Sequence, residues 1–269
     1  MRLFDEEAAS RAVEFIERLQ HTKGRWAGVQ FTLPPWQREI VREIFGRMTP
    51  QGTRAVRRAF ISLPRKNGKT TLCAAMALKL LFADREPEAE IYTCASDRDQ
   101  ASLIFNAAAS MVRRDARLLR RAKIIDSSKR IVVPKSGSFL RAIPADAGGA
   151  HGFNAQGVFA DELHTWRGPS GRELWEALTT STGARTQPLV VAITTADYDR
   201  ESLCYEEYLY ARQVAQGVIN DPAYFAAIYE PPEGYDWQSK KVWRAVNPAV
   251  AAGFRDMKEM EAEARRAQA

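Results

Sequence analysis

Short apolar runs alternate with helix-spaced apolar stripes along most of the chain. Runs bounded by turn residues predict buried strands at residues 59–63, 90–95, 157–160, 188–193 and 223–229, with shorter strands at 123–125, 130–133 and 138–143. Apolar residues at helical spacing predict helices at 6–20, 71–81, 97–113, 172–178, 201–214 and 256–267, and another that opens at Pro34 and Pro35. This order predicts an α/β fold with a mainly parallel central sheet and helices on both faces. Such sheets bind ligands at the carboxyl ends of their strands.

The predicted strand at 59–63 leads into a Pro-Arg-Lys-Asn-Gly-Lys-Thr turn and then into a helix. Strand, phosphate loop and helix is the order of a P-loop. In that motif Gly68 lets the backbone wrap around phosphate oxygens, Lys69 reaches the β- and γ-phosphates, and Thr70 places a hydroxyl on Mg²⁺. Leu63 stands where the usual motif has its first glycine. A solvated Lys-Thr turn is the alternative to the nucleotide site that this order favours.

A carboxylate pair, Asp161 and Glu162, follows the predicted strand at 157–160. Asp161 would hold Mg²⁺ through its water shell, and Glu162 would orient and deprotonate the attacking water. Acidic pairs are common at strand ends. Together with an upstream P-loop, however, this pair indicates hydrolysis in addition to binding.

The roles predicted for two further sites rest on where they lie relative to these motifs. Thr194, Thr195 and Ala196 end the strand at 188–193, where small hydroxyl residues can sense the γ-phosphate and transmit its loss. A threonine pair that caps the next helix is the alternative. Gln37 lies near a helix start upstream of the phosphate loop and is a candidate to bond the N6 and N7 edge of adenine. On spacing alone, a capping or exposed glutamine is the simpler interpretation.

Composition and charge narrow the setting. The chain has 269 residues, enough for one large α/β domain with or without a short tail. Its three scattered cysteines form no CxxC pair, and no run approaches the ~20 apolar residues of a membrane span, so we expect a soluble cytoplasmic protein without a membrane partner. Residues 113–141 carry ten Lys and Arg against two Asp, a larger surplus than the net +6 of the whole chain. A phosphate backbone is the natural partner of such a segment, and a solvated basic face is the alternative.

These stretches resemble the ATPase domain of the large terminase subunit of tailed bacteriophages, the motor that pumps DNA into the capsid. The resemblance covers nearly the whole chain and rests on HTKGRWAGVQFTLPPWQ, LPRKNGKTTL, GVFADELH, QPLVVAITTA and VNPAV. Terminase phosphate loops often lack the first glycine and carry an arginine where Arg65 stands. The resemblance implies a P-loop NTPase of the ASCE type that uses ATP and Mg²⁺. It also implies a ring oligomer on the capsid portal, with double-stranded DNA and the small terminase subunit as partners, in the host cytoplasm.

The resemblance also assigns roles to residues. It makes Gln37 the adenine contact, Thr70 and Asp161 the Mg²⁺ ligands, and Glu162 the catalytic base. The nucleotide-binding phosphate loop then comprises Pro64, Arg65, Lys66, Asn67, Gly68, Lys69, Thr70 and Thr71, of which Arg65 and Lys69 also act in catalysis. The coupling motif consists of Thr194, Thr195 and Ala196.

One departure concerns the arginine that many terminases place before the acidic pair, where it reaches into a neighbouring subunit. This chain has His151-Gly152 there, so the trans-acting arginine must be another residue, with Arg185 and Arg200 as candidates.

The pattern of apolar and polar residues changes near Glu230. We expect residues 1–230 to form the ATPase domain, with 1–58 as N-terminal helices and adenine-side segment and 59–230 as the core. Residues 231–269 would be a linker and the start of a connector to an absent nuclease domain, so no nuclease activity is expected.

Two other interpretations share these motifs. Residues Asp161 to His164 spell DExH, a helicase pattern, but too few residues follow Thr195 for a second RecA-like domain. A nucleotide-gated DNA-binding protein without turnover is the other alternative, and Glu162 argues against it. His151 and His164 flank the acidic pair, but their spacing does not match a zinc motif.

Overall fold

A twisted sheet forms the centre of the computed structural model, which describes residues 3–145 and 152–268. The strand order is β10-β3-β9-β8-β4-β7-β6-β5. These strands are β3 (Arg58–Ser62), β4 (Glu90–Ala95), β5 (Lys123–Ile125), β6 (Arg130–Val133), β7 (Ser138–Pro144), β8 (Ala155–Asp161), β9 (Leu189–Thr194) and β10 (Tyr224–Ile228). Neighbours from β10 through β7 are parallel, whereas β6 and β5 extend one edge as antiparallel strands. The predicted mainly parallel sheet is confirmed.

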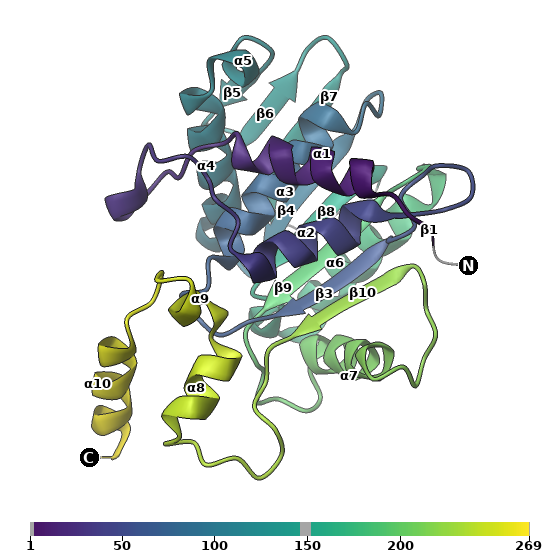
Figure 1. Ribbon diagram of the computed structural model, residues 1–269. Helices are drawn as coiled ribbons and strands as arrows, with labels where there is room; N and C mark the ends of the chain where they lie inside the picture. Colours follow the sequence, from purple (N-terminus) through teal and green to yellow (C-terminus); the bar gives the residue numbers. More distant parts are fainter. Residues whose placement is uncertain (1–2, 146–151, 269) are drawn as a thin grey trace.

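Helices cover both faces of this sheet, as predicted (Figure 1). One face carries α1 (Glu6–Glu17), α2 (Pro35–Gly46), α3 (Lys69–Ala83) and α4 (Arg98–Arg114), and the other carries α6 (Gly168–Thr180) and α7 (Leu203–Ala215). Because side chains alternate along a strand, Ile61 and Val191 belong to the core under α1–α4, whereas Phe60 and Val190 belong to the core under α6 and α7. Burial on both faces explains why these strands read as continuous apolar runs.

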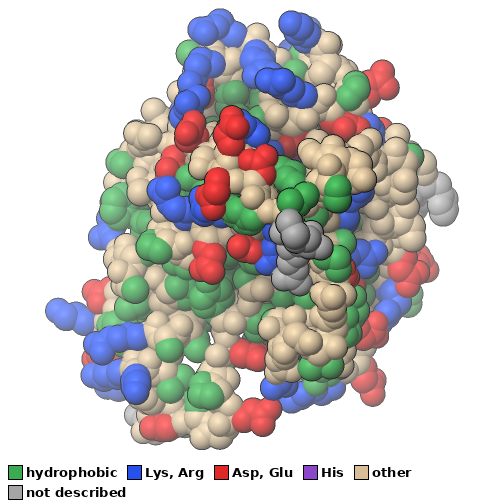
Figure 2. Space-filling model, turned by 45° about the vertical axis from the view of Figure 1, so that its right-hand side comes forward, with side chains coloured by type: hydrophobic (Ala, Val, Ile, Leu, Met, Phe, Trp, Pro, Cys, Tyr) green, Lys and Arg blue, Asp and Glu red, His purple; other side chains and the backbone are tan. Residues whose placement is uncertain are grey.

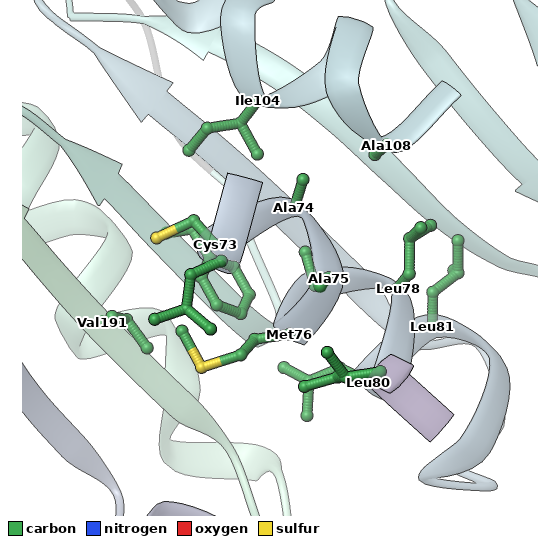
Figure 3. Close-up of a cluster of buried hydrophobic side chains, with 14 of the residues drawn as sticks. Cys73, Ala74, Ala75, Met76, Leu78, Leu80, Leu81, Ile104, Ala108 and Val191 are labelled. Atoms are coloured by element: carbon green, nitrogen blue, oxygen red, sulfur yellow. The ribbon is translucent and has the colours of Figure 1, made fainter. Parts of the chain in front are cut away.

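Helix α3, which follows the phosphate loop, is enclosed between the sheet and α4 (Figure 3). Small residues permit this close packing: Ala74 of α3 points toward α4, which presents Ala108. On the sheet side, a Cβ added at Gly157 of β8 would lie 2.7 Å from Leu80 Cδ1. The glycine therefore lets α3 lie directly against the strand that ends in the acidic pair.

The remaining elements are short or lie beyond the sheet. They are β1 (Leu3–Phe4), which pairs with β2 (Arg47–Met48), together with α5 (Ala116–Leu119), the 3-10 turns η1 (Gly24–Trp26), η2 (Leu163–Thr165) and η3 (Ser181–Ala184), and the C-terminal helices α8 (Lys240–Val246), α9 (Pro248–Ala251) and α10 (Met257–Gln268). The division of the chain near residue 230 stays a prediction.

All three cysteines, Cys73, Cys94 and Cys204, are buried free thiols. No helix in the described ranges has the length and apolar character needed to cross a membrane.

Candidate nucleotide site

The carboxyl ends of three adjacent strands bring the predicted motifs together. Strand β9 lies between β3, which leads into the phosphate loop, and β8, which ends in the acidic pair. Ser62 is in register with Thr194, and Asp161 with Ile193. Chain segments far apart in sequence therefore meet at the carboxyl ends of these strands, where open α/β sheets bind their ligands.

The phosphate loop turns without its usual first glycine. Leu63 fills that position as a core residue, 1% exposed, and its N–H donates to the carbonyl of Thr194 (3.0 Å). Two residues with left-handed backbone, Lys66 (φ 65°) and Gly68 (φ 74°), make the turn. Helix α3 begins at Lys69, two residues before the predicted start, so its N-terminal N–H groups open directly into the loop as an anion site.

Lys69 joins the loop to the acidic pair. Its side chain is 5% exposed, and Nζ lies 3.2 Å from Glu162 Oε1 while donating to the carbonyls of Leu63 (3.2 Å) and Pro64 (3.5 Å). A buried ammonium requires such partners. Its place at the helix N-terminus is the one from which a lysine reaches bound phosphates.

Thr70 and Asp161 fit a magnesium ion. Thr70 Oγ1 donates to Asp161 Oδ2 (3.2 Å), and the buried Oδ1 of Asp161 has no hydrogen-bond partner within the described ranges. Burial, followed by the charge of Glu162, raises the pKa of Asp161 to about 6. A carboxylate and a hydroxyl are ligands that Mg²⁺ prefers, and its charge would restore the ionised carboxylate that burial disfavours.

Glu162 has an uncommon left-handed backbone conformation, with φ 47°, and its side chain contacts Thr195, the residue after β9. Oε2 accepts the N–H of Thr195 (3.2 Å) and lies 3.3 Å from His164 Nδ1. Burial acts to raise the pKa of Glu162, but the hydrogen bond from His164 and the charge of Lys69 outweigh it, so the pKa is lowered. The carboxylate is therefore in the form that accepts a proton, as a general base requires.

His164 connects this base to the predicted coupling motif. Its backbone N–H donates to Thr194 Oγ1 (3.2 Å), and Nδ1 lies 3.1 Å from the same hydroxyl and 3.3 Å from Thr195 Oγ1. Sequence reasoning considered His164 only as a metal ligand or as part of the DExH string. That string was the available signal, because it places a histidine two residues after Glu162.

The other predicted nucleotide residues surround this centre. Gln37 of α2 is 4% exposed, and a Cβ at Gly68 would lie 3.2 Å from its Nε2, so the glutamine borders the phosphate loop; its contact with adenine stays a prediction. Arg65 is exposed, Thr71 is half-buried in the first turn of α3, and Ala196 is exposed beyond β9.

The two candidates for the trans-acting arginine differ. The guanidinium of Arg185 donates to the carbonyls of Asn154 (3.1 Å), Pro87 (3.1 Å) and Glu88 (2.8 Å), next to the amino ends of β4 and β8. These contacts lie at the end of the sheet opposite the phosphate loop, and the trans-acting role of Arg185 stays a prediction. Arg200 is exposed in the loop after β9, beside Tyr205, and stays a prediction. His151 lies outside the described residues.

Fold and site together define a P-loop NTPase of the ASCE type, in which β9 lies between the phosphate-loop strand and the acidic strand. Residues 35–213 match the family model of the terminase large subunit ATPase domain. The chain therefore belongs to that family, as its motifs predicted. This membership supports ATPase activity.

Individual relatives agree with this assignment. The chain is 30% identical over 265 residues to the terminase large subunit of Enterobacteria phage HK97, covering 96% of this chain and 49% of that protein. The crystal structure of the HK97 large terminase superposes with a TM-score of 0.82 at 28% identity, over 97% of this chain and 51% of the other. The ATPase domain of the Thermus phage P74-26 large terminase shares the fold, with a TM-score of 0.56 at 20% identity over 74% of this chain and 81% of that one. The chain thus spans about half the length of the HK97 protein.

Proposed function

We propose that this chain is the ATP-hydrolysing motor domain of a viral large terminase subunit, which drives double-stranded DNA into a procapsid. The observation that carries the proposal is the direct contact of Lys69 with Glu162 and of Thr70 with Asp161 at the carboxyl ends of adjacent strands. The proposed partners are further copies of the chain in a ring on the capsid portal, the small terminase subunit and DNA, in the host cytoplasm.

In the proposed reaction, Lys69 binds the β- and γ-phosphates. These oxygens compete with Glu162 for the ammonium, because charge-assisted bonds to a triphosphate are strong in a water-poor site. When Lys69 turns to the phosphates, Glu162 loses one partner and can take the proton of the attacking water. Phosphate binding and base availability are thereby linked through one side chain.

Mg²⁺, when bound, would neutralise negative charge on the phosphate oxygens. Thr70 and Asp161 would hold it. After hydrolysis, a change at Glu162 would reach Thr194 and Thr195 through His164, which contacts all three. This path gives the predicted coupling motif a physical connection to the reacting groups.

Lys69→Ala is expected to weaken nucleotide binding about 10- to 100-fold, the effect of losing hydrogen bonds to a charged group. Titration of a fluorescent ATP analogue against the purified chain measures this. Lys135→Ala, at an exposed turn distant from the site, is the control and should bind as the wild type does. Equal affinity for wild type and Lys69→Ala would refute the proposed site.

The basic segment predicted from the sequence forms one end of the molecule. Figure 2 shows Lys and Arg side chains gathered at the top, the end built by α5 and β5–β7. Arg113 pairs with Asp126, but within the described ranges Arg120, Lys123 and Lys135 form no ion pair and all three are exposed. Unpaired cations on one surface favour contact with a phosphate backbone.

Charge reversal of Arg120, Lys123 and Lys135 to Glu is expected to weaken binding to duplex DNA and to flatten its salt dependence. The slope of log K against log salt should fall by about 0.9 for each phosphate that the variant no longer neutralises. Fluorescence anisotropy with duplexes of unrelated sequence, at several salt concentrations, measures both effects. The matched control is charge reversal of three exposed residues on the C-terminal helices, Lys241, Arg265 and Arg266. An unchanged slope in the first triple variant would assign this surface to another role.

A further inference from the structure

The C-terminal helices contact the phosphate loop. Figure 1 shows α8–α10 at one end of the molecule, beyond the β3 and β10 strand ends. Residues 247–263 from this part of the chain bond to loop residues 65–67 through both buried and exposed groups. Segments about 180 residues apart in sequence are joined here, as the contact between Asn67 and Ala249 shows.

Asn67 is the buried centre of this contact, at 2% exposure. Its Nδ2 donates to the carbonyls of Pro64 (3.0 Å) and Arg65 (3.3 Å), which ties the outer turn of the loop together. Its Oδ1 accepts the N–H of Ala249 at 2.9 Å. One amide therefore fixes the loop internally and attaches it to α9.

Asn247 is the matching residue on the C-terminal side, at 4% exposure. Its Nδ2 donates to the carbonyl of Trp243 (2.9 Å), and its Oδ1 lies 3.4 Å from Asn67 Nδ2. The same Oδ1 accepts from Arg255 Nη1 (3.0 Å), which also donates to the carbonyl of Arg65 (3.5 Å). Asn247 is thus bonded to the loop directly and through Arg255.

Ion pairs accompany these bonds at the surface. Lys66 Nζ lies 3.6 Å from Glu259 and 3.3 Å from Glu263, and Arg255 pairs with Glu263 at 3.0 Å. Lys66 and both glutamates are more than half exposed, and pairs of this kind contribute little in water. The buried amides, whose loss would leave polar groups unpaired, are the stronger connection.

We propose that Asn247 is a positioning residue for nucleotide binding. Through Asn67 and Arg255 it holds the outer turn of the phosphate loop, residues 64–67, in the shape that presents the loop N–H groups to phosphate. External support of this turn favours nucleotide binding, because a pre-formed loop loses less conformational entropy when a ligand binds. This inference rests on the proposed nucleotide site and adds to it residues that follow the last strand of the sheet.

Asn247→Ala in the full chain tests the inference. We expect about fivefold weaker binding of a fluorescent ATP analogue, the order of one neutral hydrogen bond, and a similar rise in KM with kcat at saturating ATP unchanged. Arg255→Lys, which keeps the charge beside Glu263 but lacks the planar group that reaches two acceptors, should act in the same direction. Combined with Asn67→Ala, the Asn247→Ala variant should lose less than the sum of the two single effects, because both remove one connection.

Lys240→Ala is the matched control. It breaks the ion pair between Lys240 and Glu261 (2.8 Å), which joins α8 to α10 without touching the loop, and it should leave affinity unchanged. Wild-type affinity in both Asn247→Ala and Arg255→Lys would overturn the inference, as would an equal loss in Lys240→Ala, since the effect would then reflect general loosening of the helices. If Lys69→Ala also binds nucleotide normally, the proposed site itself fails. If only Lys69→Ala loses binding, the site stands and the positioning role is wrong.

Discussion

Glu162→Gln is expected to lower ATP turnover by about 10²- to 10⁴-fold, the usual cost of removing a general base. The substitution keeps the size of the side chain and one oxygen that can accept the Thr195 N–H, so the loop after β8 should stay in place. Binding of ATP should persist, because phosphate contacts come from Lys69 and the loop. Single-turnover hydrolysis measures the chemical step, and analogue titration measures binding.

Glu173→Gln provides the control, because this residue is exposed on α6 and the same chemical change there should leave turnover intact. Loss of binding together with turnover in Glu162→Gln would show that the residue supports the fold of the site. Wild-type turnover in Glu162→Gln would remove Glu162 from the mechanism altogether.

Turnover per subunit is expected to rise steeply when copies of the chain assemble, by about 10³- to 10⁵-fold if a neighbour supplies an arginine to the transition state. The isolated chain has Lys69, Thr70, Asp161 and Glu162 in contact, so slow hydrolysis should survive in a monomer. Specific activity measured across a wide range of protein concentration, with oligomeric state followed by light scattering, tests this expectation.

A mixture of two inactive variants tests whether Arg200 is the arginine that acts on a neighbouring subunit. Glu162→Gln subunits retain Arg200, and Arg200→Ala subunits retain the base, so a mixture should recover part of the activity that each lacks alone. Arg11→Ala, exposed on α1, should be fully active by itself. Fast hydrolysis independent of concentration would place the arginine within the same chain, with Arg65 as the first residue to test.

The sequence predicted the strands well because the sheet is buried on both faces and its strands are continuous apolar runs. Boundaries failed where polar residues are buried: β8 starts at Ala155 and includes Gln156, which is fully buried and donates to the carbonyl of Gln187 (3.0 Å). Helix α3 starts earlier than predicted because Gly68 takes a left-handed backbone at its N-terminus, a conformation that spacing alone does not reveal.

The centre of the site was similarly predictable, since each motif follows a strand and parallel strands have their carboxyl ends on the same side of the sheet. The contacts of Arg185 and Asn247 were not, because they depend on which backbone carbonyls and amides lie nearby after folding. Asn247 lies in VNPAV, one of the stretches that carry the family resemblance, but that string does not reveal its contact with the phosphate loop. His164 falls between these cases, because a recognisable string contained it but gave no indication that it contacts Glu162 and both threonines.

The burial of every thiol makes this chain suitable for site-specific labelling. Burial raises the pKa of Cys204 to about 12 and raises those of Cys73 and Cys94 as well, so none is a ready nucleophile for maleimide dyes at neutral pH. A cysteine introduced at Tyr198, which is 87% exposed in the loop after β9, would be the one reactive thiol. A fluorophore there would report, one molecule at a time, whether the loop next to Thr194 and Thr195 moves during a hydrolysis cycle.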